Sequence, residues 1–381
     1  MASARKFVEE LLKKADVTIG GNRPQDIIVH DERLFNRVIR YGALGLGEAY
    51  MDGWWDANSV DEFINKVLKA RLDKAFRINF ASLFLVAKAL VLNLQSNKRA
   101  FEVGEVHYDL GNDLYEAMLD KRMVYTCGYW KNAKTLGEAQ EAKLDLVCRK
   151  IGLKAGNRIL DIGCGWGSFA KYAAEKYGAS VVGVTISKEQ AALARENCKG
   201  LPVEIRIQDY RDVNEQFDHI ISLGMFEHVG VKNYRTYFEV ANRCLKDDGF
   251  FLLHTIGSNV SSLIGDPWMV KYIFPGGMLP SVAQIGEATE KLFVMEDWHS
   301  FGPDYDKTLM EWFKNFDAAW PTLREKYAVP FEASAEKGGR FYCMWKFYLL
   351  SCAGAFRSRH MELWQIVLSK NGVSGGYTSV R

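Results

Sequence analysis

A glycine-rich turn near the middle of the chain is the stretch whose residue types most clearly point to chemistry. It lies within Arg158-Ile-Leu-Asp-Ile-Gly-Cys-Gly-Trp-Gly-Ser-Phe-Ala170, where Asp161 precedes glycines at alternate positions, Gly163, Gly165 and Gly167. The apolar residues before the turn predict a strand, and glycines let a backbone approach a ligand closely. The sequence therefore predicts a nucleotide-type cofactor at the end of a strand.

The spacing of the glycines favours S-adenosylmethionine over a dinucleotide. A nicotinamide dehydrogenase needs G-x-G-x-x-G and an acidic residue about 20 positions further on, whereas this turn reads G-x-G-x-G. An aspartate beside the turn is poorly placed for phosphates, but it suits the ammonium group of S-adenosylmethionine, which has no phosphate. We expect Asp161, Gly163, Gly165 and Gly167 to contact the methionine end of this cosubstrate.

Two later segments are predicted to hold the ribose and the adenine. In "GVTISKEQ", Thr185 and Gln190 stand where many methyltransferases carry a carboxylate. Further on, Gln208, Asp209 and Tyr210 offer an amide, a carboxylate and a ring face to the adenine. Packing of Tyr210 in the core is an equal alternative from the residues alone.

Short strands alternating with helices are expected from Ile151 onward. The pattern predicts strands at 158–162, 180–185, 203–207, 219–223 and 249–254, with helices at 167–177 and 188–198. Such alternation predicts a parallel sheet wound on both sides, the Rossmann-like α/β fold of S-adenosylmethionine-dependent methyltransferases. The final residues, "GVSGGYTSVR", are expected to be disordered.

The first part of the chain is predicted to form a mainly helical N-terminal domain. We expect this domain at 1–95, a linker at 96–105 and the catalytic domain at 106–381. Residues Tyr41–Trp55 are too glycine-rich for a helix and are expected to form a structured turn. The apolar run 78–94 falls short of the ~20 residues of a membrane span, so it would bury at a domain or subunit interface or touch lipid.

Charge and cysteine content limit the function classes. The chain of 381 residues has a formal net charge of +2, and residues 1–100 carry 16 Lys and Arg against 12 Asp and Glu. This basic excess is small and suits an anionic lipid surface or an ordinary solvated one. Seven scattered cysteines without a CxxC pair favour a reducing compartment over disulfides or a metal site. The opening "MASARKFVEELLKKA" lacks a signal-peptide core, so we expect a cytoplasmic protein with no nucleic-acid partner.

Motifs between Val106 and Arg359 resemble those of the cyclopropane-fatty-acyl-phospholipid synthases, a family related to the mycolic acid cyclopropane synthases. They are "EVHYDLGNDLYEAML", "YTCGYW", "LDIGCGWG", "GVTIS", "GMFEHVG", "LLHTIG", "YIFPGGMLPS" and "CAGAFR". The resemblance implies transfer of a methylene from S-adenosylmethionine to the cis double bond of an unsaturated acyl chain in a membrane phospholipid. It also implies a protein bound peripherally to the inner face of the membrane, and the apolar run 78–94 favours a homodimer.

The resemblance further implies a set of catalytic residues. In the family the proton acceptor is a bicarbonate ion held by protein groups. Its ligands here would be Cys127 in "YTCGYW", Glu227 in "MFEHVG", His254 in "LLHTIG" and Tyr305 in "GPDYDKT", with the backbone N–H of Ile256. The histidine, the tyrosine and the amide can donate to an anion, while Glu227 can accept from the bicarbonate O–H.

Other residues are assigned by the same resemblance, and some alternatives stay open. Tyr125 and Thr126 in "YTCGYW" would contact the cosubstrate. Cys352 in "SCAGAFR" is grouped with the catalytic residues, although no covalent intermediate is needed, so we expect it to line the pocket.

From the residues alone, His254 is a candidate core histidine and Glu227 a candidate helix cap. A non-enzymatic lipid-binding protein would not need these polar groups, whereas a methyltransferase that stops at the methyl stage, or acts on a small amine, remains an alternative.

Overall fold

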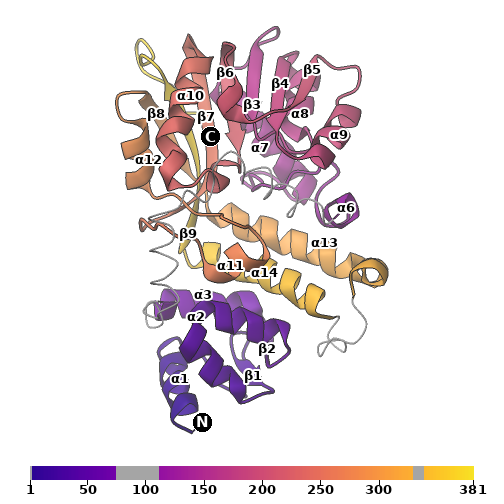
Figure 1. The fold of residues 1–381 in the computed structure, drawn as a ribbon, viewed down its shortest axis with the longest axis vertical. Helices are drawn as coiled ribbons and strands as arrows, with labels where there is room; N and C mark the ends of the chain where they lie inside the picture. Colours follow the sequence, from indigo (N-terminus) through magenta and orange to yellow (C-terminus); the bar gives the residue numbers. More distant parts are fainter. Residues whose placement is uncertain (1, 74–110, 329–338) are drawn as a thin grey trace. The chain divides into compact units, whose positions relative to one another are not determined.

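The computed structural model describes residues 2–73, 111–328 and 339–381, which form two compact units (Figure 1). Among these residues, the first unit takes in 2–73, Leu263–Pro275 and Tyr305–Met361, and the second takes in the remainder. The first unit therefore combines the N-terminal residues with two segments from the region predicted as the catalytic domain. The predicted linker 96–105 and the apolar run 78–94 lie outside the described residues.

The second unit is built on a seven-stranded sheet with the strand order β5-β4-β3-β6-β7-β9-β8. Its strands are β3 (Arg158–Ile162), β4 (Ser180–Thr185), β5 (Val203–Ile207), β6 (Phe217–Leu223), β7 (Leu245–Ser258), β8 (Val294–Ser300) and β9 (Met361–Ser369). Neighbours from β5 to β7 pair in parallel, and β8 pairs with β9 antiparallel. This sheet confirms the predicted Rossmann-like α/β fold.

Helices cover both faces of the sheet (Figure 1). They are α6 (Asn112–Met118), α7 (Leu136–Lys150), α8 (Ser168–Tyr177), α9 (Lys188–Asn197), α10 (Tyr234–Cys244) and α12 (Val282–Thr289), with 3-10 turns η2 (Tyr210–Asp212), η3 (Phe226–His228) and η4 (Val231–Asn233). Alternate strand residues point to opposite faces. Leu160 accordingly joins the core with Phe238 of α10, and Ile159 joins the core with Leu144 of α7.

The C-terminal residues after β9 are held against the second unit, so the expectation of disorder was wrong. The hydroxyl of Tyr377 donates to the backbone oxygen of Lys150 at 2.8 Å, and the Tyr377 ring packs on Phe250 at 5.7 Å. The Arg381 guanidinium binds both oxygens of Asp297 at 2.6 and 2.7 Å. The small polar residues of this tail predicted that it would be solvated. The residues that hold it, such as Lys150 and Asp297, lie far away in the sequence, so the local pattern could not reveal them.

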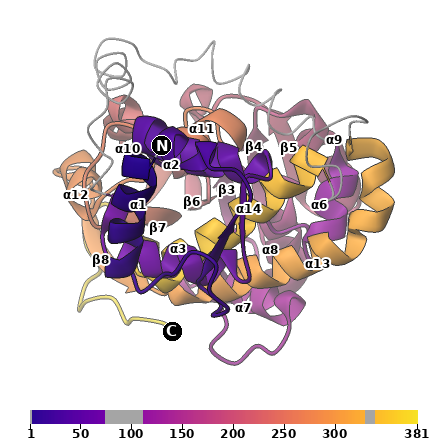
Figure 2. The ribbon, with the colours of Figure 1, turned by 90° about the horizontal axis from the view of Figure 1, so that it is seen from below.

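The first unit is mainly helical (Figure 2). It contains α1 (Ala2–Lys14), β1 (Ile27–Val29), α2 (Arg33–Met51), β2 (Trp55–Ala57), α3 (Val60–Lys69), α11 (Pro267–Tyr272), nearly all of α13 (Pro303–Tyr327) and α14 (Gly339–Arg357). Helix α14 packs against α2 and α3. At its end, Arg357 binds Asp61 of α3 at 2.6 Å and Asp306 of α13 at 2.8 Å, which ties three segments together.

The predicted turn over Tyr41–Trp55 was wrong, because most of it is helical. Helix α2 kinks at Gly42, where φ is +57°, and continues to Met51. A Cβ atom at Gly47 would lie 2.5 Å from the Trp268 ring of α11. The low helix propensity of glycine is overruled here by the close packing that its missing side chain permits.

This packing gives a first prediction. Gly47→Ala should destabilise the protein by about 1–3 kcal/mol, because the added methyl group overpacks the contact with Trp268. Gly137→Ala is the matched control, since Gly137 lies in α7 and a Cβ atom there would meet nothing within 4 Å, and alanine favours a helix by about 0.5–1 kcal/mol. Thermal and urea unfolding followed by circular dichroism measure both effects. Equal stability of the two variants would contradict the packing argument.

Candidate active site

The glycine loop connects β3 to α8, and each of its three glycines has a left-handed backbone. The φ angles are +80° at Gly163, +52° at Gly165 and +80° at Gly167. A Cβ atom at Gly163 would lie 2.7 Å from Met225, and one at Gly167 would lie 3.1 Å from the Cys198 sulfur. A Cβ atom at Gly165 would meet no other described residue within 4 Å, apart from its chain neighbours. The outer glycines thus serve packing, whereas Gly165 leaves its backbone open to a ligand.

Asp161, at the start of this loop, is a buried carboxylate with spare hydrogen-bonding capacity. Its side chain is 2% exposed, and Oδ2 has no hydrogen-bond partner within the described ranges. Burial raises the pKa of Asp161 to about 7, and the nearby charge of Lys143 opposes this rise. A cationic group beside Oδ2 would offset the cost of burying the carboxylate. The ammonium of the predicted cosubstrate fits this requirement.

The residues predicted to hold the ribose lie together at the end of β4. The Thr185 hydroxyl donates to the side-chain oxygen of Gln190 at 3.2 Å, and both residues are buried. The backbone N–H of Gln208 donates to the backbone oxygen of Thr185 at 3.0 Å, which joins the ends of β4 and β5. Parallel strands therefore bring these predicted cosubstrate residues to one edge of the sheet.

The residues predicted to hold the adenine have partners of their own. Both oxygens of Asp209 bind the Arg211 guanidinium, at 2.8 and 2.6 Å. The Tyr210 ring is buried and packs on Tyr237 at 5.3 Å between ring centres. The structure thus supports core packing for Tyr210, while a carboxylate such as Asp209 retains lone pairs for a further donor.

Helix α7 fixes the segment that contains Tyr125 and Thr126. The side-chain nitrogen of Gln140 donates to the backbone oxygen of Thr126 at 2.7 Å, and the Lys143 ammonium donates to its hydroxyl, also at 2.7 Å. A Cβ atom at Gly224, just after β6, would lie 2.5 Å from the Thr126 methyl group. This segment is therefore clamped between α7 and the carboxyl end of β6.

Gln140 and Lys143 were missed by the sequence analysis, although a signal exists. Both are fully buried, and with Leu144 and Val147 they follow the i, i+3, i+4, i+7 spacing of one helix face. Two polar residues on the apolar face of an amphipathic helix indicate buried polar contacts.

Glu227 lies in η3 just after β6, and His254 lies on the neighbouring parallel strand β7, where it pairs with Leu223, the last residue of β6. Glu227 Oε1 accepts the backbone N–H of Ile256 at 2.7 Å, so the amide expected to bind an anion is bound to Glu227 in this structure. His254 Nδ1 lies 3.3 Å from the side-chain nitrogen of Gln365. Glu227 Oε2 and His254 Nε2 are buried, and neither has a partner in the part of the chain that the structure describes.

Burial changes the protonation of this pair in opposite directions. It raises the pKa of Glu227 to about 7, with the Ile256 N–H partly offsetting the rise, and it lowers the pKa of His254 well below its usual value. At neutral pH the histidine is therefore neutral, and the glutamic acid is close to half ionised. Two groups with such displaced pKa values are suited to holding or moving a proton.

The other predicted catalytic residues divide between the two units. Cys127 is fully buried in the second unit, where its sulfur lies 3.1 Å from the backbone oxygen of Gly128. Tyr305 and Cys352 belong to the first unit, where the Tyr305 ring stacks on Phe356 at 4.6 Å. Burial raises the pKa of the Cys352 thiol, which therefore stays protonated and is a poor nucleophile.

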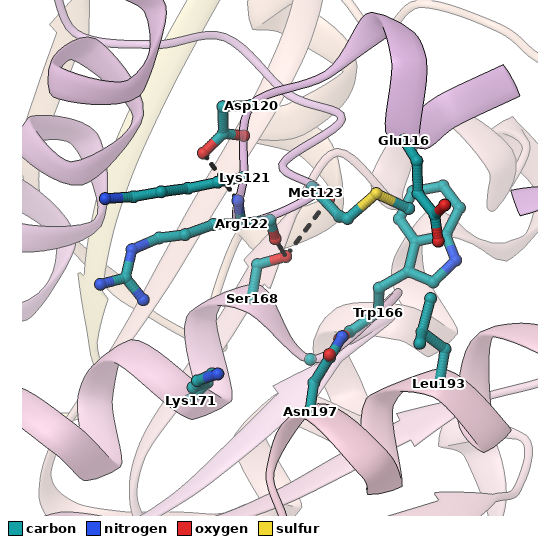
Figure 3. A pocket seen from close by; sticks show the side chains of 11 residues that line it. Glu116, Asp120, Lys121, Arg122, Met123, Trp166, Ser168, Lys171, Leu193 and Asn197 are labelled. Atoms are coloured by element: carbon teal, nitrogen blue, oxygen red, sulfur yellow. Dashed lines mark hydrogen bonds between the residues drawn. The ribbon is translucent and has the colours of Figure 1, made fainter. Parts of the chain in front are cut away.

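A cavity of about 330 Å³ lies beside the glycine loop, between α6, α8 and α9 (Figure 3). Trp166, Gly167 and Ser168 lead from the loop into its wall, and the Ser168 hydroxyl donates to the backbone oxygen of Arg122 at 2.6 Å. Among the described residues, Gly167 is the one predicted cosubstrate residue in its lining, and no predicted catalytic side chain lines it. The cavity therefore adjoins the loop without being the predicted reaction site.

Comparison with known sequences places the chain among lipid-modifying enzymes. Residues 95–366 match the family model described as "Mycolic acid cyclopropane synthetase". The chain is 53% identical over 376 residues to the "Cyclopropane-fatty-acyl-phospholipid synthase" of Escherichia coli (strain K12), which covers 99% of this chain and 96% of that protein. It is 34% identical over 304 residues to "Cyclopropane mycolic acid synthase 2" of Mycobacterium leprae, with 72% and 95% covered.

Solved structures agree with these relatives. The mycolic acid cyclopropane synthase CmaA1, complexed with SAH and CTAB, superposes with a TM-score of 0.63 and 33% identity over 71% of this chain and 98% of that one. The cyclopropane synthase MmaA2 from Mycobacterium tuberculosis gives 0.62 and 32%, with 71% and 98% covered. Coclaurine N-methyltransferase, with a TM-score of 0.69 at 22% identity over 85% of this chain and 99% of that one, shares the fold.

The open backbone at Gly165 gives a second prediction. Gly165→Val should abolish binding of S-adenosylhomocysteine, because a β-branched side chain would enter the space that a ligand needs. Gly200→Val is the matched control, since Gly200 also has a positive φ, +82°, and a Cβ atom there would meet no described residue within 4 Å apart from its chain neighbours. Isothermal titration calorimetry measures the affinity. Unchanged binding by the Gly165 variant would remove the loop from the cosubstrate site.

Proposed function

Because the chain belongs to the mycolic acid cyclopropane synthetase family and is an S-adenosylmethionine-dependent methyltransferase, we propose that it cyclopropanates membrane phospholipids. It would transfer a methylene to the cis double bond of an unsaturated acyl chain. The observation that supports a phospholipid substrate is the 53% sequence identity to the Escherichia coli synthase across 99% of this chain.

The chemistry requires a dry site with an ordered proton acceptor. A bond forms between the methyl carbon and one alkene carbon as the carbon–sulfur bond breaks. This leaves S-adenosylhomocysteine and a carbocation, and loss of a proton from the new methyl group then lets the C–H electron pair close the ring. Asp161 and the open backbone at Gly165 are proposed to hold the methyl donor. Water must be excluded, because it would capture the carbocation.

We propose bicarbonate as the bound base, held in part by Glu227, His254 and Cys127. The buried atoms Glu227 Oε2 and His254 Nε2 fit an anion that carries one O–H, since a neutral histidine can donate and a carboxylate can accept. When bound, bicarbonate would supply a base stronger than water but weak enough to exist at neutral pH. The catalytic roles of Tyr305 and Cys352 remain proposals, which rest on the resemblance of the sequence motifs.

The product is tested by fatty-acid analysis of cells that express the protein and contain unsaturated phospholipids. A cyclopropane product gains one CH₂, loses the double bond and shows ring-proton signals in nuclear magnetic resonance spectra. A branched or exomethylene chain would identify instead an enzyme that stops before ring closure.

The catalytic pair gives a third prediction. Glu227→Gln and His254→Ala should each lower kcat by roughly 10² or more, because each removes part of a proton-acceptor assembly. Binding of S-adenosylhomocysteine to both variants should stay close to that of the wild type. Removing bicarbonate should slow the wild type, and adding it back should restore the rate. Full activity in carbonate-free buffer would assign the proton transfer to a protein side chain.

The raised pKa of Glu227 gives a fourth prediction, which concerns stability. The folded protein takes up the proton more tightly than the unfolded chain, whose carboxyl has a pKa of about 4.5. The resulting stability is fully present below pH 4.5 and is lost as the pH rises through about 7. The free energy of unfolding of Glu227→Gln, relative to that of the wild type, should therefore rise by about 2 kcal/mol from pH 5 to pH 8. The same difference between the two proteins at both pH values would contradict a buried, ionising Glu227.

We further propose peripheral membrane association through the first unit, and a homodimer. Among the described residues no helix is long and apolar enough to span a membrane. Basic residues are frequent in and after α3. Lys69, the last residue of α3, and Arg71 just after it are exposed, whereas Lys74 and Arg77 lie outside the described residues. The homodimer prediction rests on 78–94, which are also outside them, and light scattering would test it.

Charge reversal tests this membrane role better than truncation. Deleting 1–95 would uncover α14, because a Cβ atom at Gly354 would lie 2.3 Å from the backbone oxygen of Asp61. Lys69→Glu combined with Arg71→Glu should weaken binding to anionic vesicles by several-fold to tens of fold, since each basic residue contributes about 1 kcal/mol near such a surface. Vesicle sedimentation measures this. A double variant that sediments with the vesicles like the wild type would exclude Lys69 and Arg71 from the membrane contact.

A further inference from the structure

Lys143 is a buried ammonium group that the proposed chemistry does not use. Its side chain is fully buried in α7 of the second unit, and Nζ donates to the Thr126 hydroxyl at 2.7 Å. Moving an ammonium out of water is unfavourable unless polar or charged neighbours compensate. The neighbours of Lys143 therefore indicate what its charge does.

Those neighbours come from several elements that meet at the carboxyl edge of the sheet. Asp120 precedes the segment of Tyr125 and Thr126, Cys127 follows it, Asp161 lies in β3 and His254 lies on β7. The charge of Lys143 acts electrostatically on Asp161 and His254, and Asp120, Cys127 and Asp161 act on Lys143 in turn. Lys150 also acts on His254, so the hydrogen bond to Thr126 is what sets Lys143 apart.

We propose that Lys143 is a positioning residue for the cosubstrate site, which fixes Thr126 by a hydrogen bond. The proposal rests on the proposed placement of S-adenosylmethionine at the glycine loop. Two contacts of α7 carry it, since Lys143 and Gln140 hold the hydroxyl and the backbone oxygen of Thr126. Because Gly224 lies directly behind the Thr126 methyl group, the segment has little room to move when these contacts are made.

The same helix supplies a matched control. Lys150 is also a buried lysine of α7, but its ammonium lies 3.1 Å from His299 Nδ1 and 3.5 Å from Asp297, away from Thr126. Lys143→Met and Lys150→Met remove the same group from the same helix. A merely structural role would make the two variants alike in both stability and cosubstrate affinity.

The test is the affinity of the full-length protein for S-adenosylhomocysteine at pH 7, measured by calorimetry, together with its thermal stability. Lys143→Met should raise Kd at least 10-fold. Lys150→Met should leave Kd unchanged. In a double-mutant cycle with Thr126→Val, the combined variant should lose less affinity than the product of the single losses. If Lys143→Met does not fold, Thr126→Val alone should still raise Kd at least several-fold.

The outcomes separate this proposal from the proposed function. If Lys143→Met binds S-adenosylhomocysteine like the wild type, the positioning role is wrong, whatever happens to stability. If both single variants lose affinity independently, the contact between Lys143 and Thr126 is not what orders the site. A wild-type protein that binds no S-adenosylhomocysteine would overturn the proposed function as well.

Discussion

The exclusion of water from three polar side chains is the constraint on which the second unit depends. Asp161, Glu227 and His254 are 2%, 7% and 1% exposed, and each keeps one polar atom without a partner among the described residues. A buried polar group left unpaired costs on the order of 1–3 kcal/mol. The fold accepts this cost at the carboxyl ends of β3 and β6 and at His254, which pairs with the end of β6. At this edge loops leave the sheet and side chains can face a ligand.

The apolar cores of the sheet offset this cost and hold the polar edge rigid. Strand residues alternate between the two faces, so Leu160 and Ile220 pack under α10 while Ile159 and Ile221 pack under α7 and α8. Because both faces are filled, β3 and β6 cannot slide past each other without exposing apolar surface. The separation of the predicted cosubstrate and proton-transfer residues of this unit is therefore set by strand pairing rather than by flexible loops.

Strand positions and the glycine loop could be predicted because their causes are local. The strands β3, β4 and β5 have the predicted bounds, since parallel strands are apolar runs bounded by turn residues. The helical nature of α2 could not be read locally, because contacts of Gly47 with Trp268, more than 200 residues away, outweigh glycine's low propensity. The docked tail was missed for the same reason, as Arg381 finds its partner in Asp297. Glu227 and His254 came from the resemblance, since an isolated glutamate or histidine carries no local signal of burial.

The opposed protonation of the two groups at the proposed reaction centre explains why a separate base is chemically reasonable. His254 is neutral over the physiological range, so it can donate one N–H without adding positive charge beside a carbocation. Glu227 has a pKa of about 7, so it gives up its proton near neutral pH and then accepts a hydrogen bond. A substrate proton taken directly by Glu227 would go to Oε2, which has no partner among the described residues, while Oε1 keeps the hydrogen bond from the Ile256 N–H. An anion held between the two groups would instead accept the proton itself, and Glu227 Oε2 would accept a hydrogen bond from its O–H.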